Sequence, residues 1–328
     1  MIRPVGMGPV EGALALSFRR PPLSERSGQP ILVGIGHPEC GPLVGLFFDA
    51  PSTADQLAAP PDLAPAHSHP CDNFRIVMKG ELLVGQERYH HGEFRLQRSG
   101  RPYGRDGDAP HVEGNWRVIV FCDRRGHRVR PTQPQLREEY ATPEAIATAK
   151  ERFGEILPVV LPDTDDGVDG LVTTIDRPFS KLGHIDGSFA ESDQWTPIGD
   201  GARAAVSLLS LHDVGPAIIL QRTPPGRLAT PAATFDSDVF RCMIAGSCED
   251  GVMRYEMGDT RFQAAGIAWP AVVAGDEGLD ELMIVGDRRG ALPEATDDPS
   301  GWARALSVLL SDLREGLPAL AAHRAVGS

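Results

Sequence analysis

Positive charge is scarce for a chain of 328 residues. Lysine and arginine together number 32 against 45 aspartates and glutamates, and the formal net charge is −13. Non-specific binding to nucleic acids or to anionic membranes requires a basic surface. We therefore expect no nucleic-acid partner.

Long apolar segments are also missing. No run of apolar residues approaches the length that a bilayer-spanning helix needs. The first residues, Met1 to Gly6, contain no hydrophobic core of the kind found in signal peptides. The sequence therefore predicts a cytoplasmic protein with no membrane partner.

Cysteine is too sparse and too irregularly spaced for a structural framework. The five cysteines are odd in number and contain no CxxC pair, which argues against a set of disulfides and against a structural zinc knuckle. Aromatic residues make up only 6% of the chain, whereas there are 36 glycines and 29 prolines. This composition favours short strands and many turns over long helices.

An internal repeat organises the chain. Residues 66–126 resemble residues 232–290, and most of the matched positions keep one offset, for example from Phe74 to Phe240 (240 − 74 = 166). After a two-residue deletion the offset becomes 164, and upstream residues 41–46 pair with residues 215–220. Each copy contains strand-like runs such as 116–121 and 281–285, rich in β-branched and aromatic residues. The repeat predicts an all-β protein with two small antiparallel barrels or double-sheet sandwiches.

The length and the repeat together predict two domains. We place the first in residues 1–140, a helical linker in 141–170, and the second domain with a C-terminal helix in 171–328. Residues 1–28 are expected to add an outer strand, in place or swapped into a partner. A stripe at helical spacing predicts that the C-terminal helix packs against a barrel or a partner subunit; it comprises Trp302, Leu306, Leu309, Leu310 and Leu313.

The first copy carries a cluster of histidines that the second copy lacks. His67 and His69 are two residues apart, so on a strand they would point to the same face. Asn73 and Gly80 follow, and His111 stands four residues before Asn115. Imidazoles at such spacing could bind one metal ion.

These residues resemble the motifs of the cupin family. The run from His67 to Gly80 is similar to the first cupin motif, HxH-x3–4-E-x6-G, and His111 with Asn115 is similar to the end of the second, H-x3-N. With the repeat, the chain resembles a bicupin with two jelly-roll barrels. The resemblance implies a metal bound by His67, His69 and His111, with Asn73 at the position of the family's glutamate.

That departure from the family pattern affects the expected chemistry. Three neutral imidazoles leave the full charge on a divalent ion, which favours an anionic or dicarbonyl chelating substrate. Three-histidine sites resemble those of gentisate-type and β-diketone-cleaving dioxygenases. The resemblance therefore implies one divalent metal, Fe(II) in the first place with Zn, Ni or Mn as alternatives, and a dioxygenase that cleaves a C–C bond in a hydroxylated aromatic acid or dicarbonyl.

The second copy provides an internal comparison. The positions of His67, His69, Asn73 and His111 are occupied there by Ala233, Phe235, Val239 and Gly275. Joint loss of all four is expected if they form one functional unit, so we predict that the second barrel binds no metal.

Three further residues of the first copy are candidate catalytic residues: Asn73, Arg75 and Tyr103. Arg75 could bind a carboxylate of the substrate. However, the second copy has Arg241 at the same position, so a structural role for Arg75 is an equally good interpretation. Two other functions stay open: a redox-inert isomerase, lyase or cyclase that uses the metal, and a non-catalytic binding protein. We expect a homodimer, the commonest oligomer of soluble proteins.

Overall fold

The computed structural model describes residues 15–18, 30–38, 40–64, 67–101, 105–126, 170–210 and 214–325. The first half contains β1 (Ala15–Phe18), β2 (Ile31–Gly34), β3 (Leu43–Phe48), α1 (Ala54–Ala58), β4 (Asn73–Lys79), β5 (Leu82–Val84), β6 (Glu87–Tyr89), β7 (Glu93–Gln97), β8 (Asp106–Asp108), β9 (Trp116–Phe121) and the 3-10 helix η2 (Arg124–Gly126).

The second half contains β10 (Val172–Thr173), β11 (His184–Ser188), η3 (Phe189–Gln194), β12 (Thr196–Gly199), β13 (Ala202–Leu208), β14 (Ala217–Thr223), β15 (Leu228–Thr230), β16 (Ala233–Thr234), β17 (Val239–Glu249), β18 (Arg254–Glu256), β19 (Thr260–Gln263), β20 (Val272–Val285), η4 (Arg288–Gly290), β21 (Glu294–Ala295) and α4 (Trp302–Ala325).

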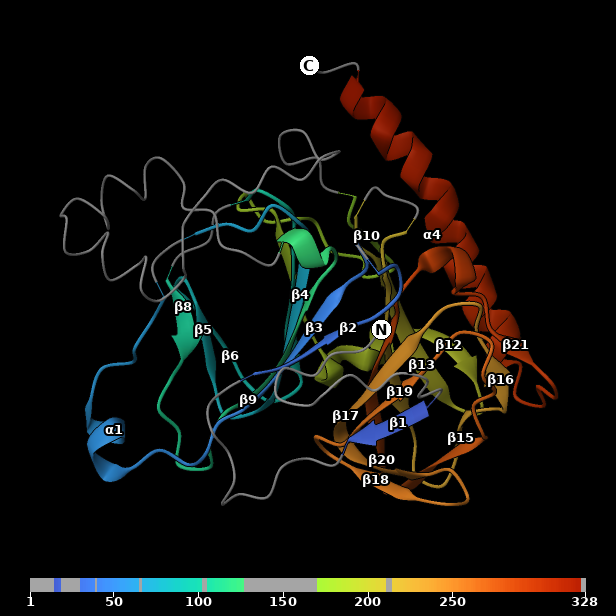
Figure 1. Ribbon diagram of the computed structural model, residues 1–328, viewed down its shortest axis with the longest axis horizontal. Coiled ribbons are helices and arrows are strands. Elements are labelled where there is room, and N and C mark those ends of the chain that lie inside the picture. The colour runs from blue at the N-terminus through green and yellow to red at the C-terminus, as the bar shows by residue number, and fades with distance from the viewer. Residues whose placement is uncertain are drawn as a thin grey trace.

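The strands form two barrels that lie side by side (Figure 1). The front barrel consists of a six-stranded sheet, in the order β11-β7-β4-β9-β3-β2, and a three-stranded sheet, β6-β5-β8. The back barrel is built on a ten-stranded sheet with the main order β1-β19-β17-β20-β14-β13-β10, and on the small β16-β21 sheet. The described chain is therefore mostly β, with a C-terminal helix, which confirms the predicted fold class.

The repeat is visible in the strand order. The front order β7-β4-β9-β3-β2 has its counterpart in the back order β19-β17-β20-β14-β13. Asn73 pairs with Gln97 and Phe121, and its counterpart Val239 pairs with Gln263 and Val285. The registers reproduce the offsets of 166 (239 − 73) and 164 (285 − 121) read from the sequence.

Each barrel takes one edge strand from the other half of the sequence. β1, near the N-terminus, pairs with β19 of the back barrel, and in Figure 1 this blue strand lies among the orange ones. β11, which follows residues 127–169, pairs with β7 of the front barrel. The expected outer strand within residues 1–28 is therefore present, and it joins the second repeat of its own chain. The domain boundaries stay a prediction, but these two strands cross them.

The largest hydrophobic cluster lies between the two barrels. Phe74 and Ile76 of β4 and Phe240 and Ile244 of β17 belong to it, and all four are buried. Because successive side chains of a strand point to opposite faces, Asn73, Arg75 and Val77 must face away from this cluster. Val77 accordingly packs with residues of β5 and β6, inside the front barrel.

The C-terminal helix packs against the face of the large back-barrel sheet that lies opposite the cluster between the barrels. Trp302, Leu306 and Leu310 are buried in a cluster with residues of β12 to β14, as the apolar stripe predicted. The indole Nε1 of Trp302 donates a hydrogen bond to Gln221 Oε1 at 2.8 Å. Within the part of the chain that the structure describes, no helix has both the length and the apolar composition to cross a bilayer. The predicted linker helix in 141–170 lies outside the described residues.

The packing of α4 gives a first test. We expect Leu306→Ala to lower the free energy of unfolding by about 2–5 kcal/mol, because it removes a fully buried side chain and leaves a cavity. Val308 on the same helix is 54% exposed, so Val308→Ala is the matched control and should change stability by less than about 0.5 kcal/mol. Urea unfolding followed by tryptophan fluorescence measures both. Equal effects of the two variants would contradict the packing described here.

Candidate functional site in the front barrel

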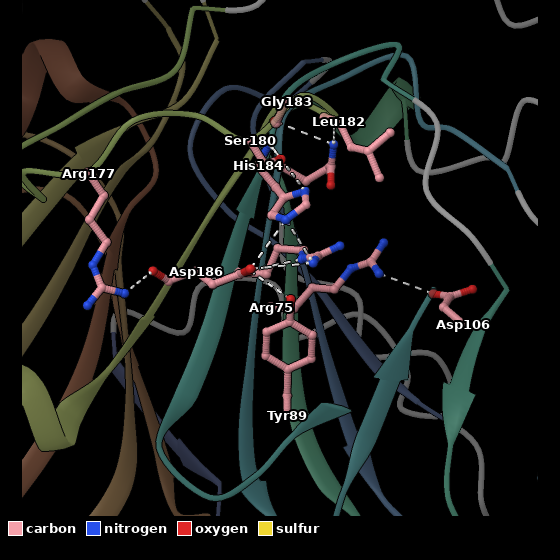
Figure 2. A network of polar contacts seen from close by, with 11 residues as sticks. Arg75, Tyr89, Asp106, Arg177, Ser180, Leu182, Gly183, His184 and Asp186 are labelled. Carbon is pink, nitrogen blue, oxygen red and sulfur yellow. Dashed lines mark hydrogen bonds and ion pairs between the residues drawn. The ribbon is translucent and has the colours of Figure 1, made fainter. Parts of the chain in front are cut away.

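Strand β4 places Asn73 and Arg75 inside the front barrel. Both are fully buried, with 1% and 2% of their surface exposed. Arg75 Nη1 donates to Asp106 Oδ2 at 3.2 Å, from the six-stranded sheet across to β8 of the three-stranded sheet (Figure 2). The ion pair therefore spans the barrel interior.

The two histidines of the HxH motif lie together on the segment before β4. Their ring centroids are 5.1 Å apart and the rings are nearly perpendicular. Both side chains are buried, and the ring of His69 also contacts Phe121 of β9 at 4.8 Å between centroids. His67 Nδ1 lies 3.7 Å from Asp106 Oδ1, so the HxH segment and the Arg75–Asp106 pair belong to one polar cluster.

His111 differs from the expectation. It lies on the loop between β8 and β9, where its Nδ1 accepts a hydrogen bond from the backbone of Glu113 at 3.2 Å and its own backbone N–H donates to Ser52 Oγ. The imidazole ring of His111 therefore stabilises the loop on which it lies. Among the described residues, no group of three His, Cys, Asp or Glu side chains is arranged to hold a metal ion. The structure thus brings the rings of His67 and His69 together, whereas their role and that of His111 as metal ligands stay predictions.

Asn115 has a structural role. Its Oδ1 accepts from the backbone N–H of Glu81 at 2.7 Å, and its Nδ2 donates to Ala109 O at 2.6 Å. Through these two hydrogen bonds, the Asn115 side chain connects the β4–β5 turn to the loop before β9. Gly80 in that turn has φ +76°, and a Cβ there would lie 1.9 Å from Asn115 Oδ1. The glycine and the asparagine of the two motifs therefore stabilise one turn, and neither is free to bind a ligand.

Asn73 is a buried residue whose side-chain amide makes no hydrogen bond. Neither Nδ2 nor Oδ1 of its buried amide has a hydrogen-bond partner in the protein. Leaving such a group unpaired costs about 1–3 kcal/mol, so a bound molecule that pairs with it recovers that free energy. Gln97 Oε1 is also unpaired, but so is Gln263 Oε1 at the repeated position, which marks the glutamines as scaffold.

The second barrel is filled at the corresponding positions. Ala233, Phe235 and Val239 are buried in one hydrophobic cluster with Trp302. These apolar side chains occupy the places of His67, His69 and Asn73. Apolar side chains therefore fill this part of the back barrel, and the absence of a metal there stays a prediction.

Within the front barrel, a second polar network joins β11 to β6 and β7 (Figure 2). Asp186 accepts hydrogen bonds from Tyr89 Oη at 2.7 Å and from Arg95 Nε at 3.0 Å, and His184 Nε2 lies 3.3 Å from its other oxygen. Burial alone would raise the pKa of Asp186, but the hydrogen bond to His184 and the charge of Arg95 prevail and lower it to about 2. Burial raises the pKa of the Tyr89 hydroxyl.

The sequence alone did not identify Asp106, His184 or Asp186. Asp106 lies outside the recognised motifs, in a glycine- and arginine-rich stretch that resembles a loop. His184 and Asp186 reach the front barrel only because β11 crosses from the second half of the chain. The candidate catalytic residue Tyr103 lies outside the described residues.

A cleft of about 510 Å³ opens near His111 at the end of the front barrel. Asp49 and Asp108 line it, and both pair with Arg117 of β9. Burial and the neighbouring Asp49 carboxylate raise the pKa of Asp108 to about 6, against the opposing effect of Arg117. Asn73 and Arg75 do not line this cleft.

The low pKa of Asp186 gives a test of the network. Because the folded-state pKa of about 2 lies below the ordinary 3.8, the carboxylate stabilises the fold above about pH 4. That contribution is lost as the pH falls from about 4 towards 2. We expect Asp186→Asn to lower the urea midpoint at pH 7 and to flatten its decline below pH 4. Asp193→Asn, at an exposed position on η3, should leave the profile unchanged; a wild-type profile in Asp186→Asn would contradict the network.

Comparison with known proteins finds a likeness in structure only. No family model matches the chain, and no curated protein matches it. A solved structure described as a "putative dioxygenase" from Nostoc punctiforme PCC 73102 aligns with a TM-score of 0.53 over 90% of this chain and 91% of that chain, at 11% sequence identity.

Oxalate decarboxylase from Bacillus subtilis aligns with a TM-score of 0.42 and 15% identity, over 86% of this chain and 78% of that chain. That TM-score is too low for the second likeness to carry weight. At such identities the comparisons show the fold alone: this chain has a cupin-like, two-barrel architecture.

Proposed function

We propose that this chain is a cupin-type enzyme whose front barrel binds and transforms a small anionic or dicarbonyl molecule. The observation that carries the proposal is the buried amide of Asn73, which has no hydrogen-bond partner in the protein. It lies on the same face of β4 as Arg75, whereas the second barrel has Val239 at that place. The back barrel then serves as a structural brace.

The residues of the cluster have distinct roles in this proposal. Asn73 offers both a donor and an acceptor to a carbonyl or hydroxyl oxygen of the ligand. Arg75 supplies the positive charge for a carboxylate or enolate oxygen. His67 and His69 are the side chains of this cluster that would exchange a proton with the ligand.

A metal-dependent reaction is the second, finer candidate, and the pair of buried imidazoles favours it. His67 and His69 would be two ligands of a divalent ion, with Fe(II) as first choice and Mn, Zn or Ni as alternatives. Bound there, such an ion would polarise a chelating oxygen of the substrate. His111 is not placed as a third ligand, so we derive no reaction step through the metal. An Fe(II)-dependent dioxygenase is the specific form of this candidate.

Ligand binding tests the first proposal. We expect sodium acetoacetate, which has a carboxylate and a ketone, to bind the purified protein in isothermal titration calorimetry. Asn73→Val, which introduces the residue of the second copy, should weaken binding about tenfold, because a buried hydrogen bond is lost.

Thr260→Val is the matched control, because Thr260 Oγ1 is a buried and unpaired polar atom of the back barrel. It should bind acetoacetate like the wild type. Equal affinity of Asn73→Val and the wild type would argue against a site at Asn73.

Metal analysis tests the second candidate. We expect roughly one divalent ion per chain in the purified protein and its loss in both His67→Ala and His69→Ala. His90→Ala, at an exposed position, is the control and should keep the ion. Mass spectrometry of the digested protein measures the metal.

The outcomes separate the three functions. Iron together with oxygen uptake on addition of a gentisate-like or dicarbonyl compound supports a dioxygenase. Zinc or nickel with turnover but no oxygen uptake supports a redox-inert isomerase, lyase or cyclase. Acetoacetate binding that persists in His67→Ala, without turnover, supports a binding protein. If the purified wild-type protein contains no metal, the metal-dependent candidate is refuted, whereas the proposed ligand site at Asn73 is not.

A further inference from the structure

The two barrels hold their repeated arginines in different ways. Arg241 of the back barrel makes two hydrogen bonds of 2.5 Å to the carboxylate of Glu281 and a third to Thr230 Oγ1 at 3.1 Å. The Arg241 and Glu281 side chains are 3% and 0% exposed. This arginine is fixed by a two-point ion pair with a neighbouring strand, and its role is structural.

The front barrel lacks that partner. The position of Glu281 is taken by Arg117 (281 − 164 = 117), and the registers agree, since Met243 pairs with Glu281 as Val77 pairs with Arg117. Where the back barrel has a carboxylate next to the repeated arginine, the front barrel thus has a second arginine. Arg117 itself pairs with Asp49 and Asp108, away from Arg75.

The carboxylate that Arg75 contacts comes instead from across the barrel. Arg75 reaches Asp106 Oδ2 through Nη1 at 3.2 Å, whereas Asp106 Oδ1 has no hydrogen-bond partner in the protein. The Asp106 side chain is 16% exposed, in contrast to the fully buried Glu281. A one-point contact between the two sheets is easier to replace than the two-point pair of Arg241, because only one hydrogen bond must be exchanged.

We propose that Asp106 occupies the place of a ligand carboxylate and is displaced when the ligand binds. This inference rests on the proposed function and specifies its ligand class. The incoming carboxylate takes the contact with Arg75, and a second oxygen of the ligand accepts a hydrogen bond from Asn73 Nδ2. Asp106 retains His67 as a neighbour, 3.7 Å away.

The spacing on β4 defines the ligand. Asn73 and Arg75 are two residues apart on one face, which corresponds to about 6–7 Å along a strand. The arginine side chain is long and the asparagine side chain is short, so the ligand must be compact. A small carboxylate with a carbonyl or hydroxyl oxygen two or three bonds away, such as a β-keto acid, matches the pair. A simple fatty acid carboxylate would leave Asn73 unpaired.

Calorimetry with acetoacetate and with butyrate tests the displacement. Both are four-carbon carboxylates, and butyrate lacks the ketone oxygen. We expect Asp106→Asn to bind acetoacetate about tenfold tighter than the wild type, because a neutral amide competes less well for Arg75. Arg75→Gln should bind it at least about tenfold more weakly, and Asn73→Val should lose the preference for acetoacetate over butyrate.

Asp280→Asn is the matched control, because it neutralises the aspartate of another Arg–Asp pair, Arg222–Asp280 of the back barrel. It should leave both affinities unchanged, and circular dichroism checks that each variant is folded. Unchanged or weaker acetoacetate binding by folded Asp106→Asn overturns the inference.

Failure of the inference and failure of the proposed function are distinguishable. If the wild type binds acetoacetate through Asn73 and Asp106→Asn gains nothing, only the displacement by Asp106 is refuted. If neither the wild type nor Asp106→Asn binds acetoacetate, the proposed site is refuted as well.

Discussion

The alternation of side chains along β4 is the constraint on which the rest of the structure depends. Phe74 and Ile76 must reach the hydrophobic cluster between the barrels, so Asn73 and Arg75 are directed into the front barrel. A shift of one residue in register would place an arginine in the apolar cluster between the two sheets. The packing that joins the halves therefore also fixes the polar face of the site.

The back barrel shows what the same backbone does when its buried charges pair with one another. There Val239 replaces Asn73, and Arg241 is neutralised by Glu281 on the next strand. Burying a charged pair is tolerable only when the geometry is good and the hydrogen bonds are complete, as they are for this pair. The front barrel instead has an unpaired Asn73 amide and an Asp106 carboxylate with one oxygen that makes no hydrogen bond, and such unpaired buried groups are a cost that ligand binding can offset.

The two halves are connected by more than apolar contacts. Asp72, immediately before β4, accepts backbone hydrogen bonds from Ser99, Gly170 and Ser210, and so connects loops of both halves. Burial raises the pKa of this carboxyl. With the exchanged strands β1 and β11, these contacts make each barrel dependent on the other, which agrees with a bracing role for the second copy.

The sequence by itself determined the all-β class and the two copies with their registers. It could do so because strand periodicity and the offset between the copies are local properties of the chain. Only the tertiary structure decided the partners of Arg75 and of Arg95 and the contacts of His111. Asp106 comes from the opposite sheet, His184 and Asp186 come from a strand of the other half, and His111 is bound to its own loop. Contacts of this kind depend on how sheets close and strands exchange, which spacing within a motif does not encode.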